Sequence, residues 1–268
     1  MTQKLSVTII TLNEEKNVRT CIESVKSIAD EVIVVDSGSK DKTQLIAEEL
    51  GAKFIHNDWP GHQEQKNYAI DQTSNEWILS LDADEWIDER LAKEIKAVLE
   101  ADGDGADGYQ IDRETMFLGE FVKVWSPDWI FRLFKKSKGR FGGVNPHDVV
   151  IMKPDSVCKK LKNPFFHNSY QTLEQYFSRM NAYTTIGSRA LFKKGKRFSL
   201  HKLLLSPGWM FVRKFLFKQG FRDGYRGLLI SISSAFYVFM KYAKLWSIQV
   251  CGEDDIENNI SSEHASRS

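Results

Sequence analysis

The sequence has few cysteines, no long apolar run and almost no net charge, and each shortage excludes a class of protein. Its three cysteines, Cys21, Cys158 and Cys251, are scattered along 268 residues. No two have the spacing of metal ligands, and an odd number does not fit a disulfide framework. The first fifteen residues contain only a short apolar run and two acids, unlike a signal peptide. These features favour the reducing cytosol.

The net charge of +1 gives no argument for a nucleic-acid partner, but the charges are unevenly distributed. Residues 190–246 contain twelve lysines and arginines, thirteen aromatic residues and a single acid, Asp223. From Glu253 onward the sequence is acidic and polar and lacks an apolar pattern, so we expect residues 251–268 to be a disordered tail. A basic, aromatic segment therefore precedes an acidic one.

Two segments of this basic region bear on membrane binding. Gly227–Met240 is uncharged for fourteen residues and contains three serines. A transmembrane helix needs about 20 apolar residues, so we expect a helix that is buried or lies in the membrane interface without spanning it. The segment WMFVRKFLFKQGF, which begins at Trp209, mixes aromatic residues with cations. It is typical of an interfacial helix on anionic lipid, and also of a basic helix that packs on another domain.

The N-terminal half alternates short apolar segments with helical patterns. The segments predict buried strands, which are Leu5–Leu12, Glu31–Asp36, Ala52–His56 and Trp77–Leu81. Helices are expected over 14–28, from Asp41 to Leu50, and over 63–72 and 88–100. This order predicts an α/β fold with a Rossmann-like, mostly parallel sheet and flanking helices. Further strands are expected over 109–113 and 129–135, and a helix over 173–190.

Polar clusters follow three of these strands, at the edge of the sheet where such folds bind ligands. The third cluster is Asp82-Ala83-Asp84. Two carboxylates one residue apart can hold Mg²⁺ or Mn²⁺ against the diphosphate of a sugar nucleotide. The alternative is a pair of turn or cap aspartates before the helix that begins near Asp88. Their position directly after the apolar segment WILSL favours the metal site.

Two further residues are candidates for binding a nucleotide. Asp36, at the end of its strand, can accept a hydrogen bond from a base or a ribose hydroxyl, or can simply form a turn. Lys66, at the start of a predicted helix, can pair with phosphate, although a solvated helix lysine is the more common situation.

A third group of candidates concerns the transfer step. His147 and Asp148 lie in RFGGVNPHD, which we interpret as a loop. Asp148 is a candidate for the base that deprotonates an acceptor hydroxyl, and His147 is a candidate to assist it or to contact the metal or diphosphate. Asp128 in SPDW is the competing base. His167, in NPFFHNSY, either lines the acceptor side or lies in the core.

Taken together, these positions resemble glycosyltransferase family 2, whose members have the GT-A fold. The resemblance rests on SVTIITLNEEKN, EVIVVDSGSKDKT, the QKNYA helix and ILSLDADEW, in that order over residues 6–86. The segments WIFRLFKK, NPHD and FFHNSY are further similar to bacterial transferases of lipopolysaccharide inner-core assembly, the glucosyltransferases that extend a core heptose.

The resemblance implies a UDP-sugar donor, Mg²⁺ or Mn²⁺, and inversion at the anomeric carbon. It assigns a group of residues to the nucleotide, namely Thr11, Leu12, Glu14, Asp36, Lys66 and Asp82. Asp84 is assigned to the metal, with Asp82 beside it. Many family members have an aromatic residue where this chain has Leu12, so aliphatic packing replaces stacking on the base there.

The sequence thus predicts a GT-A catalytic domain over residues 1–190 and a helical, basic and aromatic C-terminal subdomain over 191–250. The expected activity is transfer of a hexose, glucose, from a UDP-sugar to a glycan or glycolipid acceptor of the lipopolysaccharide core. A lipid-linked acceptor favours a peripheral location on the inner face of the cytoplasmic membrane. A sugar nucleotidyltransferase is the nearest alternative, but the first predicted strand lacks the glycine-rich phosphate loop of that class. A non-catalytic protein that binds sugar nucleotides or lipid is the other.

Overall fold

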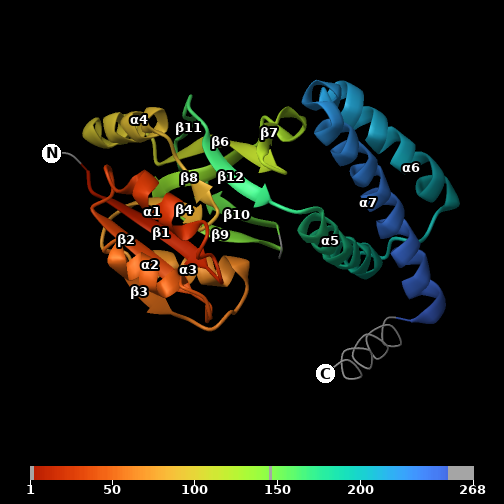
Figure 1. The fold of residues 1–268 in the computed structure, drawn as a ribbon, viewed down its shortest axis with the longest axis horizontal. Helices are drawn as coiled ribbons and strands as arrows, with labels where there is room; N and C mark the ends of the chain where they lie inside the picture. Colours follow the sequence, from red (N-terminus) through yellow and green to blue (C-terminus); the bar gives the residue numbers. More distant parts are fainter. Residues whose placement is uncertain (1–2, 145–146, 253–268) are drawn as a thin grey trace. The chain divides into compact units, whose positions relative to one another are not determined.

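A computed structural model describes residues 3–144 and 147–252, and the chain divides into two compact units (Figure 1). The first unit contains the chain up to Met116 together with Ser126–Ser169. The second contains Phe117–Trp125 and the chain from Tyr170 onward.

The first unit is built on a mixed sheet with the strand order β3-β2-β1-β4-β8-β6-β12-β5, and β11 also pairs with β6. These strands are β1 (Leu5–Thr11), β2 (Glu31–Asp36), β3 (Lys53–His56), β4 (Trp77–Asp82), β5 (Glu85–Trp86), β6 (Gly108–Phe117), β8 (Trp129–Lys135), β11 (Cys158–Lys160) and β12 (Phe165–Tyr170). The strands β3, β2, β1 and β4 are mutually parallel, whereas β8 is antiparallel to both β4 and β6. The predicted α/β fold with a mostly parallel sheet is confirmed, and the antiparallel strands make that sheet a mixed one.

Helices and a hairpin cover the two faces of this sheet, because its central strands are apolar on both sides. The helices are α1 (Val18–Val25), α2 (Thr43–Glu49), α3 (His62–Asp71) and α4 (Glu89–Glu100). Val7 and Leu79 on one face pack with residues of α1, α2 and α4. On the other face, Ile33 and Val35 pack against Ala69 of α3, and Ile78 packs with Ile70 of the same helix.

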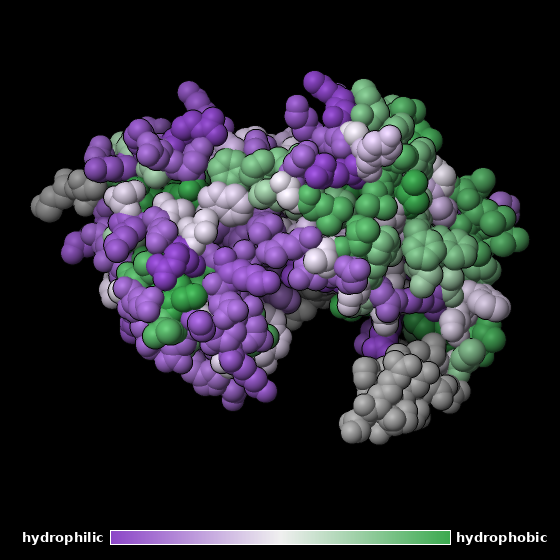
Figure 2. All heavy atoms as spheres, viewed as in Figure 1, coloured by the Kyte–Doolittle hydropathy of each residue, from purple (hydrophilic) through white to green (hydrophobic). Residues whose placement is uncertain are grey.

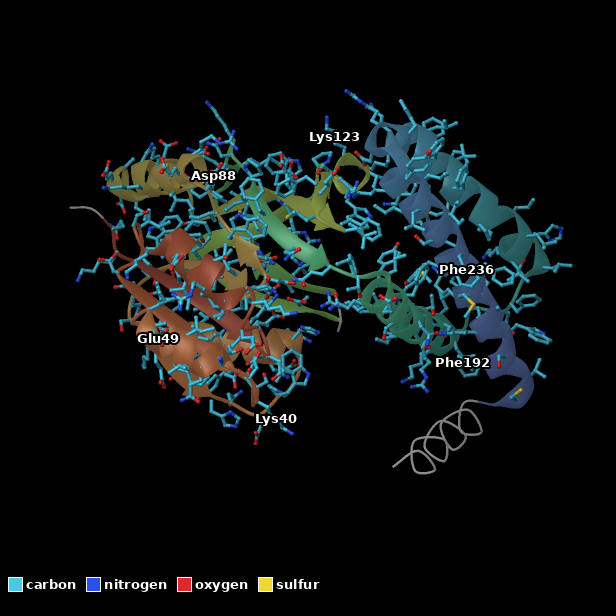
Figure 3. The ribbon with its side chains drawn as sticks, in the orientation of Figure 1. Lys40, Glu49, Asp88, Lys123, Phe192 and Phe236 are labelled. Carbon is cyan, nitrogen blue, oxygen red and sulfur yellow. The ribbon has the colours of Figure 1, made fainter. Side chains whose placement is uncertain are left out.

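The first helix begins later than expected. Helix α1 starts at Val18 rather than near residue 14, because Asn13 has a left-handed backbone with φ of 54° and residues 14–17 form a turn. The amide of Glu14 in this turn donates to the hydroxyl of Thr43 at 2.8 Å. Helix α4 is capped by Asp88, which is labelled in Figure 3. Its carboxylate accepts hydrogen bonds from the backbone amides of Arg90 and Leu91.

The segment interpreted as a loop around Asp148 is a β-hairpin, so that interpretation is wrong. Strands β9 (Gly139–Val144) and β10 (His147–Met152) are antiparallel, and Asp148 pairs with Gly143. Phe141 and Val150 of the hairpin pack against Phe134 of β8. This apolar contact stabilises strands whose glycine content favoured a loop.

The second unit is mainly helical. Its elements are β7 (Glu120–Val122), α5 (Leu173–Lys193), α6 (Leu200–Val212), α7 (Gly224–Cys251) and the short helical turns η2 (Lys123–Trp125), η3 (Arg213–Phe217) and η4 (Gly220–Asp223). Its core joins Phe117, Val122 and Val124 to Tyr176 of α5 and Ile230 of α7. The expected helical, basic C-terminal region is therefore present.

The sequence suggested a domain boundary at residue 190, whereas the second compact unit contains the chain from Tyr170 onward. Helix α5 belongs to the second unit because it packs on α7: the hydroxyls of Tyr176 and Ser233 are hydrogen-bonded at 2.8 Å. Lys244 of α7 likewise donates to the carbonyl of Asn181 at 2.8 Å. Within the described residues, the helical stretch Gly220–Cys251 is long and apolar enough to cross a membrane. The predicted disordered tail from Glu253 lies outside the described residues.

Candidate active site

The carboxyl ends of the parallel strands bring three predicted site residues to one edge of the sheet. Thr11 at the end of β1 is the register partner of Asp36 at the end of β2. On its other side, β1 pairs Ile10 with Asp82 at the end of β4. Thr11, Asp36 and Asp82 therefore lie side by side, as the sequence pattern predicted.

Asp36 organises the turn that follows its strand. Its carboxylate is 3% exposed and accepts hydrogen bonds from the amides of Gly38 and Ser39, each at 2.7 Å. The Ser39 hydroxyl also donates to it. Gly38 has φ of 96°, a conformation that favours glycine. The turn reading of Asp36 is thus correct, and any contact with a nucleotide adds to that role.

The loops after β1 and β2 are joined to each other. The amide of Asn13 donates to the Ser39 hydroxyl at 2.7 Å, and the Asn13 side chain accepts from the amide of Lys40 at 2.8 Å. The neighbouring Leu12 is 48% exposed, and the Glu14 carboxylate accepts from the Asn17 side chain at 2.7 Å. These bonds hold the loops after β1 and β2 together, and we call this edge of the site the rim. The side chain of Leu12 is exposed to solvent on it.

Lys66 links two predicted carboxylates that lie far apart in the sequence. The Lys66 ammonium lies 3.0 Å from Asp82 and 2.9 Å from Asp148. The lysine side chain is only 5% exposed and lies over the Phe141 ring at 5.2 Å. Burial alone would lower the pKa of Lys66, but Asp82 and Asp148 raise it above its usual range. Lys66 is therefore a buried, permanently charged group rather than a solvated helix lysine.

A buried arginine also contacts Asp82. Arg132 of β8 contacts Glu85 at 2.5 Å and Asp82 at 3.4 Å, and its guanidinium lies 5.4 Å from the centre of the Phe165 ring. Burial would raise the pKa of Asp82, but the charges of Lys66 and Arg132 keep it well below its usual range. For Glu85, which is fully buried, burial prevails over Arg132 and raises the pKa. Asp82 is therefore ionised at neutral pH.

The two aspartates of the Asp82-Ala83-Asp84 segment have different partners. Asp84 does not join the lysine and arginine but lies 3.2 Å from Nε2 of His167 on β12. Both side chains are nearly buried, at 15% and 12% exposed. The other ring nitrogen of His167, Nδ1, is buried without a hydrogen-bond partner. Neither aspartate caps α4, because Asp88 does.

A cavity of about 540 Å³ adjoins this network within the first unit. Lys66, Asp82, Arg132 and Asp148 line one part of it. The rest is lined by residues of β6, β8, β9 and β10 with their flanks, namely Gln110, Arg113, Asp128, Trp129, Ile130, Phe131, Phe141, Val149 and Val150. The volume is within the range of pockets that bind small molecules.

Both candidate bases line the cavity, and each is paired with a cation. Asp128 accepts from the Arg113 guanidinium at 2.7 Å, and its side chain is 39% exposed. Asp148 is 13% exposed and shares Lys66 with Asp82. The backbone of His147 begins β10, but its side chain lies outside the described part of the structure.

Three members of the site were not recognised from the sequence as such. Arg132 and Glu85 were not singled out, and His167 was assigned to the acceptor side or the core rather than to Asp84. A weak signal exists for Arg132, since it interrupts the apolar segment WIFRLF, where a buried charge needs a partner.

Comparison with known proteins identifies the class to which this fold and site belong. The sequence profile of "Glycosyl transferase family 2" matches residues 6–153. An uncharacterized glycosyltransferase of Rickettsia typhi is 35% identical over 91% of this chain and 87% of its own length. The lipopolysaccharide core biosynthesis glycosyltransferase LpsC of Rhizobium meliloti is 28% identical over 90% and 92% of the two chains. The protein belongs to glycosyl transferase family 2.

Solved structures with a related arrangement include glucosyl-3-phosphoglycerate synthase from Mycobacterium tuberculosis and Staphylococcus aureus TarS. The synthase superposes with a TM-score of 0.48 and 17% identity over 74% of this chain and 82% of that one. TarS residues 1–349 give a TM-score of 0.47 and 17% identity over 93% and 92%. The resemblance to family 2 that the motifs suggested is confirmed by the profile match.

Proposed function

We propose that this protein is an inverting glycosyltransferase that moves a hexose, glucose, from a UDP-sugar to a glycan or glycolipid acceptor of the lipopolysaccharide core. The observation that carries the proposal is the Lys66 ion pair with Asp82 and Asp148 beside a 540 Å³ cavity. The relative LpsC, named for lipopolysaccharide core biosynthesis, supports the acceptor class. Family 2 membership favours sugar transfer over the alternatives of nucleotidyl transfer and non-catalytic binding.

The nucleotide part of the donor is assigned to the rim formed by the first two strand ends. Thr11 and Asp36 are adjacent there, and Leu12 offers an exposed aliphatic side chain to the base. Asp36 contributes mainly by fixing the turn after β2, since its oxygens already accept three hydrogen bonds from that turn. Glu14 completes the rim beside Leu12.

A divalent cation, Mg²⁺ or Mn²⁺, fits the charges and donors of the site. The site has more carboxylates than cations. The carboxylates are those of Asp82, Asp84, Glu85 and Asp148, and the two permanent cations are Lys66 and Arg132.

Among the described residues no three metal-ligating side chains converge, so at most two of these side chains would hold the ion. Asp84 and His167 are the pair that would hold the ion, and Asp82, the last residue of β4, precedes Asp84 by two positions. Mg²⁺ typically takes one or two carboxylates together with substrate phosphates and water. When bound, such an ion neutralises the charge of a diphosphate leaving group.

Lys66 and Arg132 are assigned to the diphosphate. Both cations line the cavity and both are held in place by buried ion pairs. A positively charged pair that is fixed before substrate arrives stabilises developing negative charge without reorganising. Each of them contacts Asp82 and one further carboxylate, which is Asp148 for Lys66 and Glu85 for Arg132.

Asp148 is assigned as the general base, with Asp128 as the alternative and His147 as an assisting group. Asp148 is bonded to Lys66, the lysine that also contacts Asp82, so it lies on the donor side of the cavity. Asp128 is bonded to Arg113 instead and is more exposed. A base has to reach the acceptor hydroxyl while the oxygen of that hydroxyl faces the reacting carbon of the donor, which favours the carboxylate nearer the donor.

A UDP-sugar panel tests the proposed function. Purified protein is incubated with UDP-glucose, UDP-galactose, GDP-mannose and free UDP, with and without Mn²⁺ or Mg²⁺. We expect metal-dependent stabilisation against heat by UDP and slow release of UDP from UDP-glucose. Stabilisation by a GDP-sugar and not by UDP would contradict the donor assignment, and full turnover in chelator would contradict the metal.

A further inference from the structure

We infer that α6 and η3 lie in the surface of an anionic membrane, with one apolar face inserted into a single leaflet. The inference rests on the proposed function in one respect only, namely that membrane binding would give the enzyme access to a lipid-borne acceptor. The structural reason is separate: α6 is apolar, and none of its thirteen residues, all of them described, is buried.

The apolar face consists of five side chains, which are Leu204, Leu205, Trp209, Leu216 and Phe217. They are 63%, 69%, 60%, 54% and 68% exposed. Leu205 and Trp209 are four residues apart on the helix and therefore neighbours on its surface. The rings of Trp209 and Phe217 lie 5.7 Å apart, so the face continues from α6 into η3.

This exposure is unusual for a folded protein in water. Single exposed hydrophobic residues are common, but contiguous apolar patches mark surfaces that are covered by a partner. Figure 2 shows hydrophobic side chains gathered over α6 and α7, whereas the visible surface of the first unit is mostly hydrophilic. Phe221 and Phe236, the latter labelled in Figure 3, are exposed as well, at 53% and 47%.

The charges next to the apolar face favour lipid as the partner. Lys202, Arg213 and Arg222 are exposed on the same segment. Asp223, the single acid in residues 190–246, is used inside the unit, where its carboxylate accepts from the amide of Val124 at 2.8 Å. A second copy of the chain would bring like charges together on this face. Anionic lipid headgroups complement them, and the attraction falls with added salt.

Helix α7 serves as the support of α6 and does not cross the bilayer. Its polar contacts are spread along its length: Arg226 pairs with Glu120 at 3.2 Å, and Lys244 donates to Thr184 and Thr185 at 2.8 and 2.7 Å. A membrane-spanning helix would carry these groups, with Glu120 of β7 and the part of α5 that Lys244 contacts, toward the hydrocarbon. That transfer is costly, whereas an amphipathic helix lying at the interface keeps its charges in water.

Vesicle sedimentation of the full chain tests the inference. The probes are vesicles of phosphatidylethanolamine with phosphatidylglycerol, and vesicles of phosphatidylcholine alone, each at low and high salt. We expect binding to the anionic vesicles that weakens as salt is added. The variant L205E/F217E should reduce the bound fraction roughly tenfold or more, because two charges replace the centre of the inserted face.

A matched control comes from the first unit. Leu45 on α2 is 55% exposed, so L45E introduces the same charge at a similarly exposed leucine outside the apolar face. We expect L45E to bind vesicles like the unchanged protein. The W209F variant keeps an apolar ring and should retain binding while losing most of the blue shift of tryptophan emission on vesicle addition.

Three outcomes would overturn the inference. They are no binding of the unchanged protein to anionic vesicles at low salt, equal losses in L45E and L205E/F217E, and a stable dimer in light scattering that L205E/F217E dissolves. UDP binding is measured without vesicles on the same preparations. Loss of vesicle binding with normal UDP binding overturns the membrane surface alone, whereas normal vesicle binding without UDP binding overturns the proposed function alone.

Discussion

Lys66 contacts two carboxylates that are 16 and 82 residues away from it along the chain. Because Asp82 raises the pKa of the lysine against the effect of burial, the ammonium stays charged at neutral pH. The donor-side aspartate and the proposed base are therefore held by one fixed cation. Substitutions in this group are expected to separate binding from chemistry.

The D148N substitution should leave UDP-sugar binding intact and lower transfer by about 10²–10⁴-fold, because a carboxamide keeps the shape but cannot accept the proton. Steady-state kinetics and calorimetry with UDP measure the two effects. D128N serves as the matched control and should be mild. The opposite pattern, with a severe D128N and a mild D148N, would move the base to Asp128.

The D84A substitution should abolish transfer while the fold survives, since Asp84 is a proposed metal ligand that does not cap a helix. H167A should raise the Mn²⁺ concentration needed for binding UDP. Calorimetry of Mn²⁺ with UDP and thermal melts of the variants provide the measurement. Near-normal turnover of D84A at saturating Mn²⁺ would remove the residue from the metal site.

The R132M substitution should destabilise the protein by about 3–5 kcal/mol, because it leaves the buried Glu85 carboxylate without its cation. The R113M substitution is the matched control. It breaks a partly exposed pair with Asp128 and should cost at most about 1 kcal/mol. Thermal and urea unfolding measure both. Equal melting temperatures for R132M and R113M would show that the buried pair is not a main source of stability.

The sequence correctly predicted the placement of those candidate site residues whose position depends only on the order of the strands. Asp36 and Asp82 end parallel strands, and that position alone brings them together. It failed for Arg132 and for the pairing of Asp84 with His167, because both depend on antiparallel strands, whose register no local pattern specifies.

At the level of elements, the β9–β10 hairpin carries the proposed base and is packed closely against β8. A Cβ atom added at Gly139 would lie 2.7 Å from Cδ2 of Phe134 and 2.9 Å from Sδ of Met152. Phe134 is a fully buried ring, so it has little freedom to move aside. Gly139, which directly precedes the segment interpreted as a loop, is therefore needed for close packing of a strand.

The G139A substitution should therefore lower stability by about 1–3 kcal/mol through overpacking, and should lower transfer more than UDP binding because the hairpin shifts. Thermal melts and initial rates measure this. G208A in α6 is the control: its Cβ meets nothing within 4 Å, and it should stabilise slightly. A stability of G139A equal to that of the unchanged protein would mean that the hairpin has room to adjust.

The strands that were predicted correctly are those with a continuous apolar, β-branched sequence. Strand β2 spans Glu31–Asp36 and β8 spans Trp129–Lys135, the ranges expected from the sequence. The strand β5 has two residues and β11 has three, too short to display any period. Strands β9 and β12 were missed because glycine in one and polar residues in the other obscure the alternation.

At the level of the whole molecule, the second unit is assembled from two separate stretches of chain, and helix α5 packs within it. A chain shortened to residues 1–190 would keep α5 but lose Ile230 and Ser233 of α7, which cover Phe117 and Tyr176. We expect such a chain to aggregate during purification. Light scattering and thermal melts test this expectation. A 1–190 chain that is soluble and unfolds cooperatively would support residue 190 as the domain boundary.

The separate stretch Phe117–Trp125 also sets an order of events during protein synthesis. Val124 leaves the ribosome 106 residues before Ile230, its partner in the core of the second unit. At about 5–20 residues per second, the apolar side chains of this stretch wait roughly 5–20 s for that partner. The strands β1 to β4 precede this stretch and are complete during the wait. The nascent chain thus carries a partly finished sheet with an unpaired apolar extension, which is the kind of intermediate that chaperones bind.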